Sequence, residues 1–386
     1  MARLGTETAF DVLSRAEALA REGRDIINLG IGQPDFKTAP HIVEAGIKAL
    51  RDGHHGYTPP LGIPALREAV ARDLERRYRV DVSPERIAIM PGGKPTMFFA
   101  CLMFGQPGVE IMYPDPGFPI YRSMIEFTGA TPVPMTLHEA DGFAFRADDV
   151  LARITPATRL IILNSPGNPT GGVTPKPEID ALAAGLEAHP QVMVLSDEIY
   201  AHLLFDRAAH TTLLAYPHLR ERVILLDGWS KAYAMTGWRL GYAVWPQSCI
   251  EAVTRLCVNA HSCVNAPTQL AGIAALEGPQ DAIAAMVEAF QARRDVAVAA
   301  LNAMSGVRCV VPGGAFYAFP NITGTGMDAK TLQTALLEEA GVATIAGTSF
   351  GAGGEGYLRL SFANSMDNIE RALARMASLL ETRAAP

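Results

Sequence analysis

The sequence predicts an α/β protein with two domains. Short apolar runs such as 160–163 and 223–226 are typical of buried strands, and stretches with helical spacing lie between them. The chain has 386 residues, which is too long for one ordinary hydrophobic core. Hydrophobic residues make up 49% and charged residues 19%, as in globular rather than disordered proteins. We therefore expect a helix-covered sheet and a second, smaller unit.

Composition excludes several classes of function. The net charge of −7 and the absence of a long basic run argue against nucleic acid as a partner, because binding phosphates needs clustered Lys and Arg. The five cysteines are scattered, and no histidine pair has metal-site spacing, so we expect no disulfide framework and no metal. Residues 1–25 lack the apolar core of a signal peptide, and no apolar run could span a membrane. We expect a cytoplasmic protein with no membrane partner.

The first elements along the chain are a helix over 8–20 and a short strand within 26–31. Gly32 then precedes Pro34, which indicates either a plain turn or a loop where the backbone approaches a ligand closely. A helix over 41–50 follows.

Tyr57 comes next, in a loop over 56–64 that three prolines and two glycines constrain. Pro64 suits the first turn of the helix that follows. Two interpretations of Tyr57 are open: the side chain packs on the chain's own core, or it serves a binding site.

Two predicted strands, over 86–90 and 109–112, each lead into a turn that is a candidate ligand-binding site. The glycine-containing turn 91–96 precedes a helix over 97–103, and backbone N–H groups at a helix N-terminus form an anion site. Phe118 follows the second strand, where its ring either joins the core or stacks on a ligand.

The strand over 159–163 leads into a turn, 164–171, whose prolines and glycines fix its shape. After a helix over 178–188, the run 192–200 predicts a strand that ends in acids, at Asp197 and Glu198. A carboxylate at a buried strand end is costly unless a cation or donor pairs with it. Asp197 is therefore a candidate partner for a positive group.

Lys231 lies just beyond the strand over 223–226, at the rim of the sheet where open α/β folds bind ligands. A lysine amine there can form a Schiff base with a carbonyl. Arg239 follows eight residues later, and its planar guanidinium suits a phosphate. For a lysine without such a context, a solvated surface position would be the better interpretation.

The rest of the chain predicts a strand over 240–245, helices over 249–258 and 267–277, and a long helix over 281–304 that bridges the domains. Residues 305–386 indicate an α+β unit, with strands over 308–311, 315–320 and 357–362 and helices over 328–340 and 366–383. Arg359 faces opposite to its strand neighbours, so it is either a rim charge or a buried anion clamp.

Together these segments resemble class I/II pyridoxal-phosphate aminotransferases of fold type I, which are aspartate-aminotransferase-like. The motifs are S-K-x-x-x-M-T-G-W-R-x-G-Y from Ser230, N-x-P-x-N-P-T-G from Asn164, Y-x-P-x-x-G-x-x-x-L-R from Tyr57 and Y-x-R-[LI]-S-[FY] from Tyr357. The resemblance covers about residues 10–380. It implies a large domain, 41–280, with a mostly parallel seven-stranded sheet between helices, and a small α+β domain formed by 1–40 and 281–386.

The resemblance also implies a role for each matched residue. Lys231 would hold pyridoxal 5'-phosphate covalently and move the proton, and Asp197 would pair with the pyridine nitrogen. The other implied contacts are Gly93, Lys94 and Arg239 at the phosphate, Ser230 at the cofactor, Phe118 on the ring, Asn168 and Tyr200 at the phenolic oxygen, Gly32, Asn168 and Arg359 at the substrate, and Tyr57 at the phosphate of a neighbouring subunit. Whether the Lys94 side chain takes part is left open. One departure is Gly228, where relatives often carry a phosphate-binding hydroxyl.

The expected activity is transfer of an amino group from an L-amino acid to a 2-oxo acid by a ping-pong mechanism, in a homodimer with shared sites. A cysteine-S-conjugate β-lyase on the same fold would use the same residues and stays an alternative. A non-catalytic regulator is disfavoured because such proteins carry a basic DNA-binding module. A purely structural protein would leave Lys231, Asp197, Arg239 and Arg359 unexplained.

Overall fold

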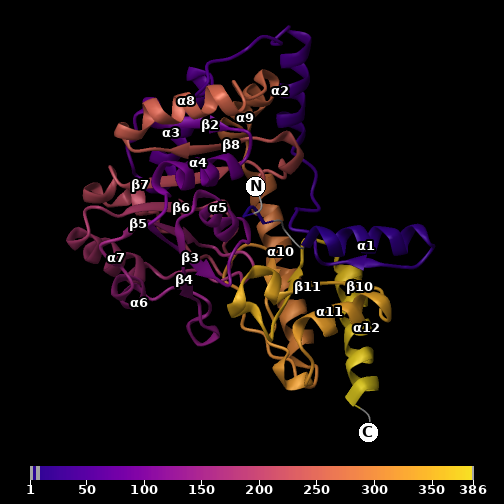
Figure 1. Ribbon diagram of the computed structural model, residues 1–386. Coiled ribbons are helices and arrows are strands. Elements are labelled where there is room, and N and C mark those ends of the chain that lie inside the picture. Colours follow the sequence, from indigo (N-terminus) through magenta and orange to yellow (C-terminus); the bar gives the residue numbers. More distant parts are fainter. Residues whose placement is uncertain (1–2, 6–8, 385–386) are drawn as a thin grey trace.

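The centre of the protein is a seven-stranded sheet, seen at the upper left of Figure 1. The structure is a computed structural model, and it describes residues 3–5 and 9–384. Within these residues the strand order is β2-β8-β7-β6-β5-β3-β4. The strands are β2 (Ile87–Met90), β3 (Glu110–Asp115), β4 (Thr131–Thr136), β5 (Thr158–Asn164), β6 (Met193–Asp197), β7 (Val223–Gly228) and β8 (Gly241–Val244).

The sheet is mostly parallel, as predicted. Strand β8 pairs antiparallel with both β2 and β7, whereas the pairs from β7 to β4 are all parallel. Because parallel strands end at the same edge, the carboxyl ends of β3, β5, β6 and β7 meet there.

Both faces of the sheet are buried. Along β5, Ile161 and Leu163 pack into one apolar cluster while Leu160 and Ile162 pack into another, as the period of two along a strand requires. The first face is covered by α2 (Pro40–Arg51), α3 (Pro64–Tyr78), α6 (Ala147–Ala152), α7 (Lys176–Gly185) and α9 (Ala266–Glu277). The second face is covered by α4 (Lys94–Phe104), α5 (Ile120–Thr128) and α8 (Ile250–Ala260).

Strand β4 was not predicted. It contains Pro132 and Pro134, which cannot donate to a ladder and so argue against a strand. The structure explains their presence, because β4 is the last strand of the sheet and pairs only with β3. Proline is tolerated at such an edge.

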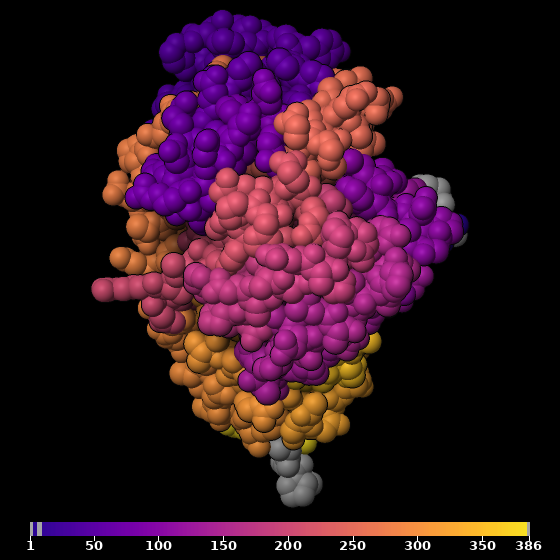
Figure 2. Space-filling view, turned by 90° about the vertical axis from the view of Figure 1, so that its left-hand side faces the viewer, coloured from indigo at the N-terminus to yellow at the C-terminus, as the bar shows by residue number. Residues whose placement is uncertain are grey.

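The C-terminal part forms a second group of strands and helices below the sheet, coloured orange to yellow in Figures 1 and 2. It contains a three-stranded antiparallel sheet of β11 (Ile345–Ala346), β12 (Leu358–Ser361) and β9 (Tyr317–Ala318). Three helices pack there: α10 (Asp281–Asn302), α11 (Ala329–Glu338) and α12 (Met366–Ala384). The N-terminal segment returns to this part, because α1 (Ala9–Arg21) contacts β10 (Val342–Ala343) and β1 (Ile27–Asn28) pairs with it.

The predicted helices and most predicted strands are present, with two exceptions in the strands. The helix predicted over 8–20 begins at Ala9, and residue 8 lies outside the described residues. The strand predicted over 308–311 is wrong: Arg308 forms one isolated bridge with Asn321. Both backbone groups of Cys309 instead bond to the side chain of Asn302, at 2.8 and 3.0 Å. The strand predicted over 315–320 shortens to β9.

No helix in the described part of the chain is long and apolar enough to cross a membrane. All five cysteines are free thiols, and four of them are buried.

Candidate active site

The site lies where the carboxyl ends of the parallel strands meet. Asn164 ends β5, Asp197 ends β6, and the two residues are partners in the register of these strands. The side chain of Asn164 donates to the carbonyl oxygen of Asp197 at 3.1 Å, which ties the two strand ends together. A cavity of about 330 Å³ opens over this edge, a volume suited to a small ligand.

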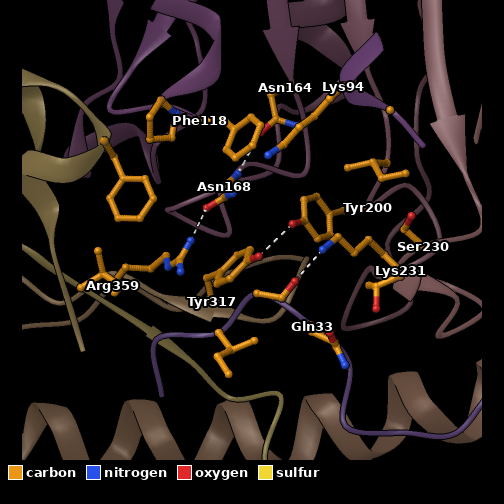
Figure 3. Close-up of a pocket in the computed structure, with 18 of the residues that line it drawn as sticks. Gln33, Lys94, Phe118, Asn164, Asn168, Tyr200, Ser230, Lys231, Tyr317 and Arg359 are labelled. Atoms are coloured by element: carbon orange, nitrogen blue, oxygen red, sulfur yellow. Dashed lines mark hydrogen bonds between the residues drawn. The ribbon is translucent and has the colours of Figure 1, made fainter. Parts of the chain in front are cut away.

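Nearly all the predicted site residues line this one cavity, although they come from segments spread over the whole chain (Figure 3). They are Gly32, Gly93, Lys94, Phe118, Asn168, Asp197, Tyr200, Ser230, Lys231, Arg239 and Arg359. Tyr57 is the exception: it does not line the cavity, and its side chain is 92% exposed. The interpretation that Tyr57 packs on the chain's own core is therefore wrong.

Lys231 follows β7 and directs its amine into the cavity. The Nζ atom donates to the carbonyl oxygen of Gly32 at 2.5 Å. It also lies 5.7 Å from the ring centre of Tyr200 and 5.6 Å from that of Phe316. The amine is thus held between a loop and two aromatic rings, within reach of a ligand's carbonyl carbon.

Asp197 is a buried carboxyl group with a perturbed acidity. Its side chain accepts hydrogen bonds from the Tyr121 hydroxyl at 2.6 Å and from the Ile199 amide at 3.3 Å. Burial raises the pKa of Asp197 to about 6, even though these two hydrogen bonds lower it. A cation brought against this carboxyl group would favour its charged form and replace the water that it has lost.

The cavity also carries groups for an anion, at Arg239 and the turn before α4. Arg239 has left-handed backbone geometry (φ 54°) and donates to the carbonyl oxygens of Thr236 at 2.8 Å and Pro91 at 3.2 Å. A Cβ on Gly92 would lie 2.2 Å from Nη2 of Arg239, so only glycine lets the guanidinium lie over this turn. The same turn begins α4, whose N-terminal dipole adds positive potential.

Gly228, the departure noted in the sequence, has a structural reason. It pairs with Gly241 across β7 and β8, and a Cβ on Gly228 would lie 2.7 Å from the Cα of Gly241. A hydroxyl-bearing side chain therefore has no room at position 228. Two other hydroxyl residues, Ser230 and Thr236, line the cavity close to Lys231 and Arg239.

Arg359 is a buried group, which excludes the rim interpretation. Its guanidinium donates to Oδ1 of Asn168 at 3.0 Å and to the carbonyl oxygen of Gly30 at 2.6 Å. The rings of Tyr317 and Phe350 lie on it, each with its centre 4.7 Å from Cζ. Because Oδ1 of Asn168 accepts from Arg359, the amide nitrogen of Asn168 is the group that can donate to a ligand.

These groups fit pyridoxal 5'-phosphate. The cofactor needs an amine for its aldehyde, an anion site for its phosphate and a carboxylate for its pyridine nitrogen. Lys231 offers the amine, the turn of Gly92 with Arg239 offers the anion site, and Asp197 offers the carboxylate. The ring of Phe118 lies at the same cavity, available for stacking.

Sequence reasoning missed three residues of the site. Asn164 opens the motif recognised over 164–171, and Tyr121 follows Phe118 by three residues, yet neither received a role. Tyr317 was treated as an ordinary strand residue. A signal existed for the first two, since each belongs to a patterned turn, but nothing in the run around Tyr317 separates a core tyrosine from a site tyrosine.

Comparison with known proteins identifies the family and the fold. The family model described as aminotransferase class I and II matches residues 24–376. The chain is 37% identical over 381 residues to an aspartate/prephenate aminotransferase of Nitrosomonas europaea, covering 96% of each chain. It superimposes on the aspartate aminotransferase of Rhizobium meliloti with a TM-score of 0.94 at 34% identity, covering 99% of this chain and 98% of the other. For the Thermus thermophilus aspartate aminotransferase with maleate the TM-score is 0.92 at 35% identity, covering 98% and 99%.

Proposed function

This chain belongs to the class I and II aminotransferases, and from that membership we propose that it moves the amino group of an acidic L-amino acid to a 2-oxo acid. Amino-group transfer with pyridoxal phosphate is the activity of the family. One observation carries the assignment of residues: Lys231, Asp197 and Arg359 reach a single cavity from three separate segments. We further propose that 41–280 form a large cofactor-binding domain and that 1–40 and 281–386 form a small domain, acting in the cytoplasm.

Each side chain has a proposed task. When bound, pyridoxal phosphate supplies an electron sink for the bond broken at the amino acid's α-carbon. Lys231 would carry the proton from that carbon to the cofactor in the first half-reaction and from the cofactor to the carbon of the 2-oxo acid in the second, as a general base and acid. Asp197 keeps a proton at the pyridine nitrogen by pairing with it, and Arg359 grips the α-carboxylate with two parallel hydrogen bonds.

The remaining residues hold the cofactor and orient the substrate. Arg239 and the start of α4 bind the phosphate, together with the Ser230 hydroxyl and the backbone at Gly93. Phe118 stacks on the ring, Tyr200 and Asn168 donate to the phenolic oxygen, and the Gly32 backbone lies against the substrate carboxylate. Tyr200 and Asp197 are both buried, so their polar groups have little contact with bulk water.

An acidic substrate is proposed from Lys94. Its ammonium group lines the cavity and lies 5.6 Å from the ring centre of Phe118, so it offers a positive charge to a ligand held there. The relatives named above act on aspartate and prephenate, and one structure holds maleate; all three are dicarboxylates. Arg359 would bind the α-carboxylate and Lys94 the second one.

A panel of amino donors and 2-oxo acid acceptors tests this proposal. We expect the wild type to transfer the amino group from aspartate to 2-oxoglutarate. In Lys94→Met, kcat/KM for aspartate should fall roughly tenfold, whereas kcat/KM for alanine should stay within about twofold of wild type. The difference arises because only aspartate loses an ion pair. Lys330→Met, which removes an exposed lysine outside the cavity, is the control. Release of ammonia and pyruvate from a cysteine S-conjugate without any acceptor would select the β-lyase instead. Equal losses of kcat/KM for aspartate and alanine in Lys94→Met would show that Lys94 does not bind the substrate side chain.

We also propose a homodimer in which Tyr57 reaches the phosphate of the neighbouring subunit. Tyr57 stands out from the surface, and Thr58 fixes its loop by donating to Sγ of Cys263 at 3.5 Å and to the carbonyl oxygen of Val264 at 3.3 Å. The segment it rests on follows α8, where Val258 is 51% exposed. An exposed tyrosine in an anchored loop and an exposed valine on α8 both suit an interface, and a two-fold axis makes the exchange reciprocal.

Mixing two inactive variants tests the shared site. Tyr57→Asp places a repelling carboxylate at the neighbour's phosphate, and Lys231→Ala removes the amine, so each homodimer should be nearly inactive. After dissociation and reassociation in equal amounts, about half the dimers are hybrids with one intact site each, and activity should return to about a quarter of wild type.

The matched control mixes Lys231→Ala with Asp197→Asn. Both lesions lie in the subunit's own cavity, so their hybrids contain no intact site and should stay inactive. If native mass spectrometry detects hybrids of Tyr57→Asp with Lys231→Ala and activity still does not return, Tyr57 serves its own subunit and the crossing is disproved.

A further inference from the structure

Tyr317 occupies the centre of the cavity wall, between Tyr200 and Arg359 (Figure 3). Its hydroxyl lies 2.8 Å from the hydroxyl of Tyr200, and its ring centre lies 4.7 Å from Cζ of Arg359. The residue is 1% exposed. It therefore touches both the residue proposed for the cofactor's phenolic oxygen and the residue proposed for the substrate carboxylate.

The strand register fixes this position. Tyr317 of β9 pairs with Ser361 of β12, and Arg359, two residues earlier on β12, shares the face of Ser361. The ring of Phe316 packs on Tyr317 with a centre distance of 4.8 Å. On the remaining side, a Cβ on Gly32 would lie 2.4 Å from the Tyr317 hydroxyl, so the backbone of this loop closes over it. The hydroxyl is thus aimed at Tyr200 with little freedom to turn elsewhere.

The direction of the hydrogen bond between the two tyrosines follows from counting protons. A phenol has one proton to donate and can accept as well. If Tyr200 donates its proton to the cofactor's phenolic oxygen, its oxygen is left to accept, and Tyr317 must be the donor. A phenol that accepts a hydrogen bond becomes a stronger donor itself, because bonds in a chain polarise one another.

We propose that Tyr317 is a positioning residue whose hydroxyl donates to Tyr200 and so strengthens the hydrogen bond from Tyr200 to the cofactor's phenolic oxygen. The inference rests on the function proposed above for Tyr200. It gives Tyr317 an effect on the electronic state of the bound cofactor that is transmitted through Tyr200. Its ring, by contrast, belongs to the support of Arg359 and is unchanged by loss of the hydroxyl.

The test is a pH titration of the visible absorbance of the cofactor-loaded protein. A hydrogen bond to the phenolic oxygen draws electron density from it and favours loss of the proton on the nearby Lys231 nitrogen, so weakening that bond raises the titration midpoint. We expect the midpoint to rise by roughly one pH unit in Tyr200→Phe and by roughly 0.3 unit in Tyr317→Phe. The dissociation constant for maleate should stay within about twofold in Tyr317→Phe, because the ring beside Arg359 remains.

Tyr357→Phe is the matched control. It also removes a tyrosine hydroxyl from the C-terminal part, one that donates to Glu139 at 3.0 Å, but it lies outside the cavity and should leave the midpoint unchanged. A shift in Tyr200→Phe without one in Tyr317→Phe would overturn the inference alone. A downward shift in Tyr317→Phe would overturn it too, since Tyr200 would then be the donor to Tyr317. No shift in Tyr200→Phe would instead refute the proposed role of Tyr200.

Discussion

Replacement of Lys231 by alanine should lower turnover by roughly 10⁴-fold or more and abolish the visible absorbance of the covalently held cofactor. The amine of Lys231 lies just beyond β7 and is proposed both to bond to the cofactor's aldehyde and to carry a proton at the substrate's α-carbon. Its neighbours Gly32, Tyr200 and Phe316 hold it in place but offer no substitute base. Stopped-flow turnover and absorbance spectra measure the two losses.

Lys94→Met is the control for this experiment, because Lys94 lines the same cavity but is proposed to bind the substrate side chain. It should keep the visible absorbance. Non-covalent cofactor binding should survive in Lys231→Ala, since Arg239 and Asp197 remain. Undiminished turnover in Lys231→Ala would refute the proposed mechanism as a whole.

Asp197→Asn should reduce turnover by roughly 10³-fold while leaving the KM for the amino acid nearly unchanged. An amide cannot stabilise a protonated pyridine nitrogen, so electron withdrawal from the α-carbon weakens, whereas Arg359 still binds the carboxylate. Steady-state kinetics with aspartate separate the two parameters.

The raised pKa of Asp197 adds a second measurement, on the cofactor-free protein. A carboxyl group with a pKa of about 6 when folded and about 3.9 when unfolded contributes stability below pH 4 and loses it as pH rises through 6. The loss is about 3 kcal/mol, and Asn, which stays neutral, escapes it. The melting temperature of cofactor-free Asp197→Asn should therefore exceed that of the wild type by a margin that grows as pH rises from 4 to 7.

Glu198→Gln is the matched control, since it changes the neighbouring carboxyl group. Glu198 does not line the cavity; it accepts hydrogen bonds from Ser196 and Thr212, both at 2.9 Å, and contacts His210 at 2.7 Å. Its loss should lower stability without the change in turnover. A Glu198→Gln protein that is inactive while Asp197→Asn is active would transfer the assignment to Glu198.

Much of the fold could be predicted because its strands are short apolar runs that end in polar or glycine-rich turns. The runs ending at Asn164 and Asp197 appear as buried strands in the sequence and are buried strands in the structure. Prediction failed where a strand's partner decided the outcome. Pro132 and Pro134 are compatible with β4 because that strand is at an edge, and Cys309 is not in a strand because Asn302 takes its backbone bonds. Neither fact is local in sequence.

The site, like the fold, contains some residues that local sequence patterns predict and others that they do not. Residues in patterned turns, such as Asn168 and Lys231, were found from the family motifs, and the structure brings them to one cavity. Tyr317 was missed because its importance comes from the register of β9 against β12 and from the absence of a side chain at Gly32. Tyr57 poses the opposite problem: its motif is clear, yet the group it would contact is not in its own chain.

The glycines behind the anion end of the cavity limit how this site can change. A Cβ on Gly228 would meet Gly241, and a Cβ on Gly241 would lie 2.9 Å from the backbone of Gly92, whose own Cβ would meet Arg239. The three positions form one row in which each backbone leaves no space for a side chain on the next. A designer who wishes to restore a phosphate-binding hydroxyl at 228 cannot do so by one substitution, because strand β8 would first have to move away from β7. Changes at these sites are therefore interdependent, and variant libraries should randomise the row together or leave it intact.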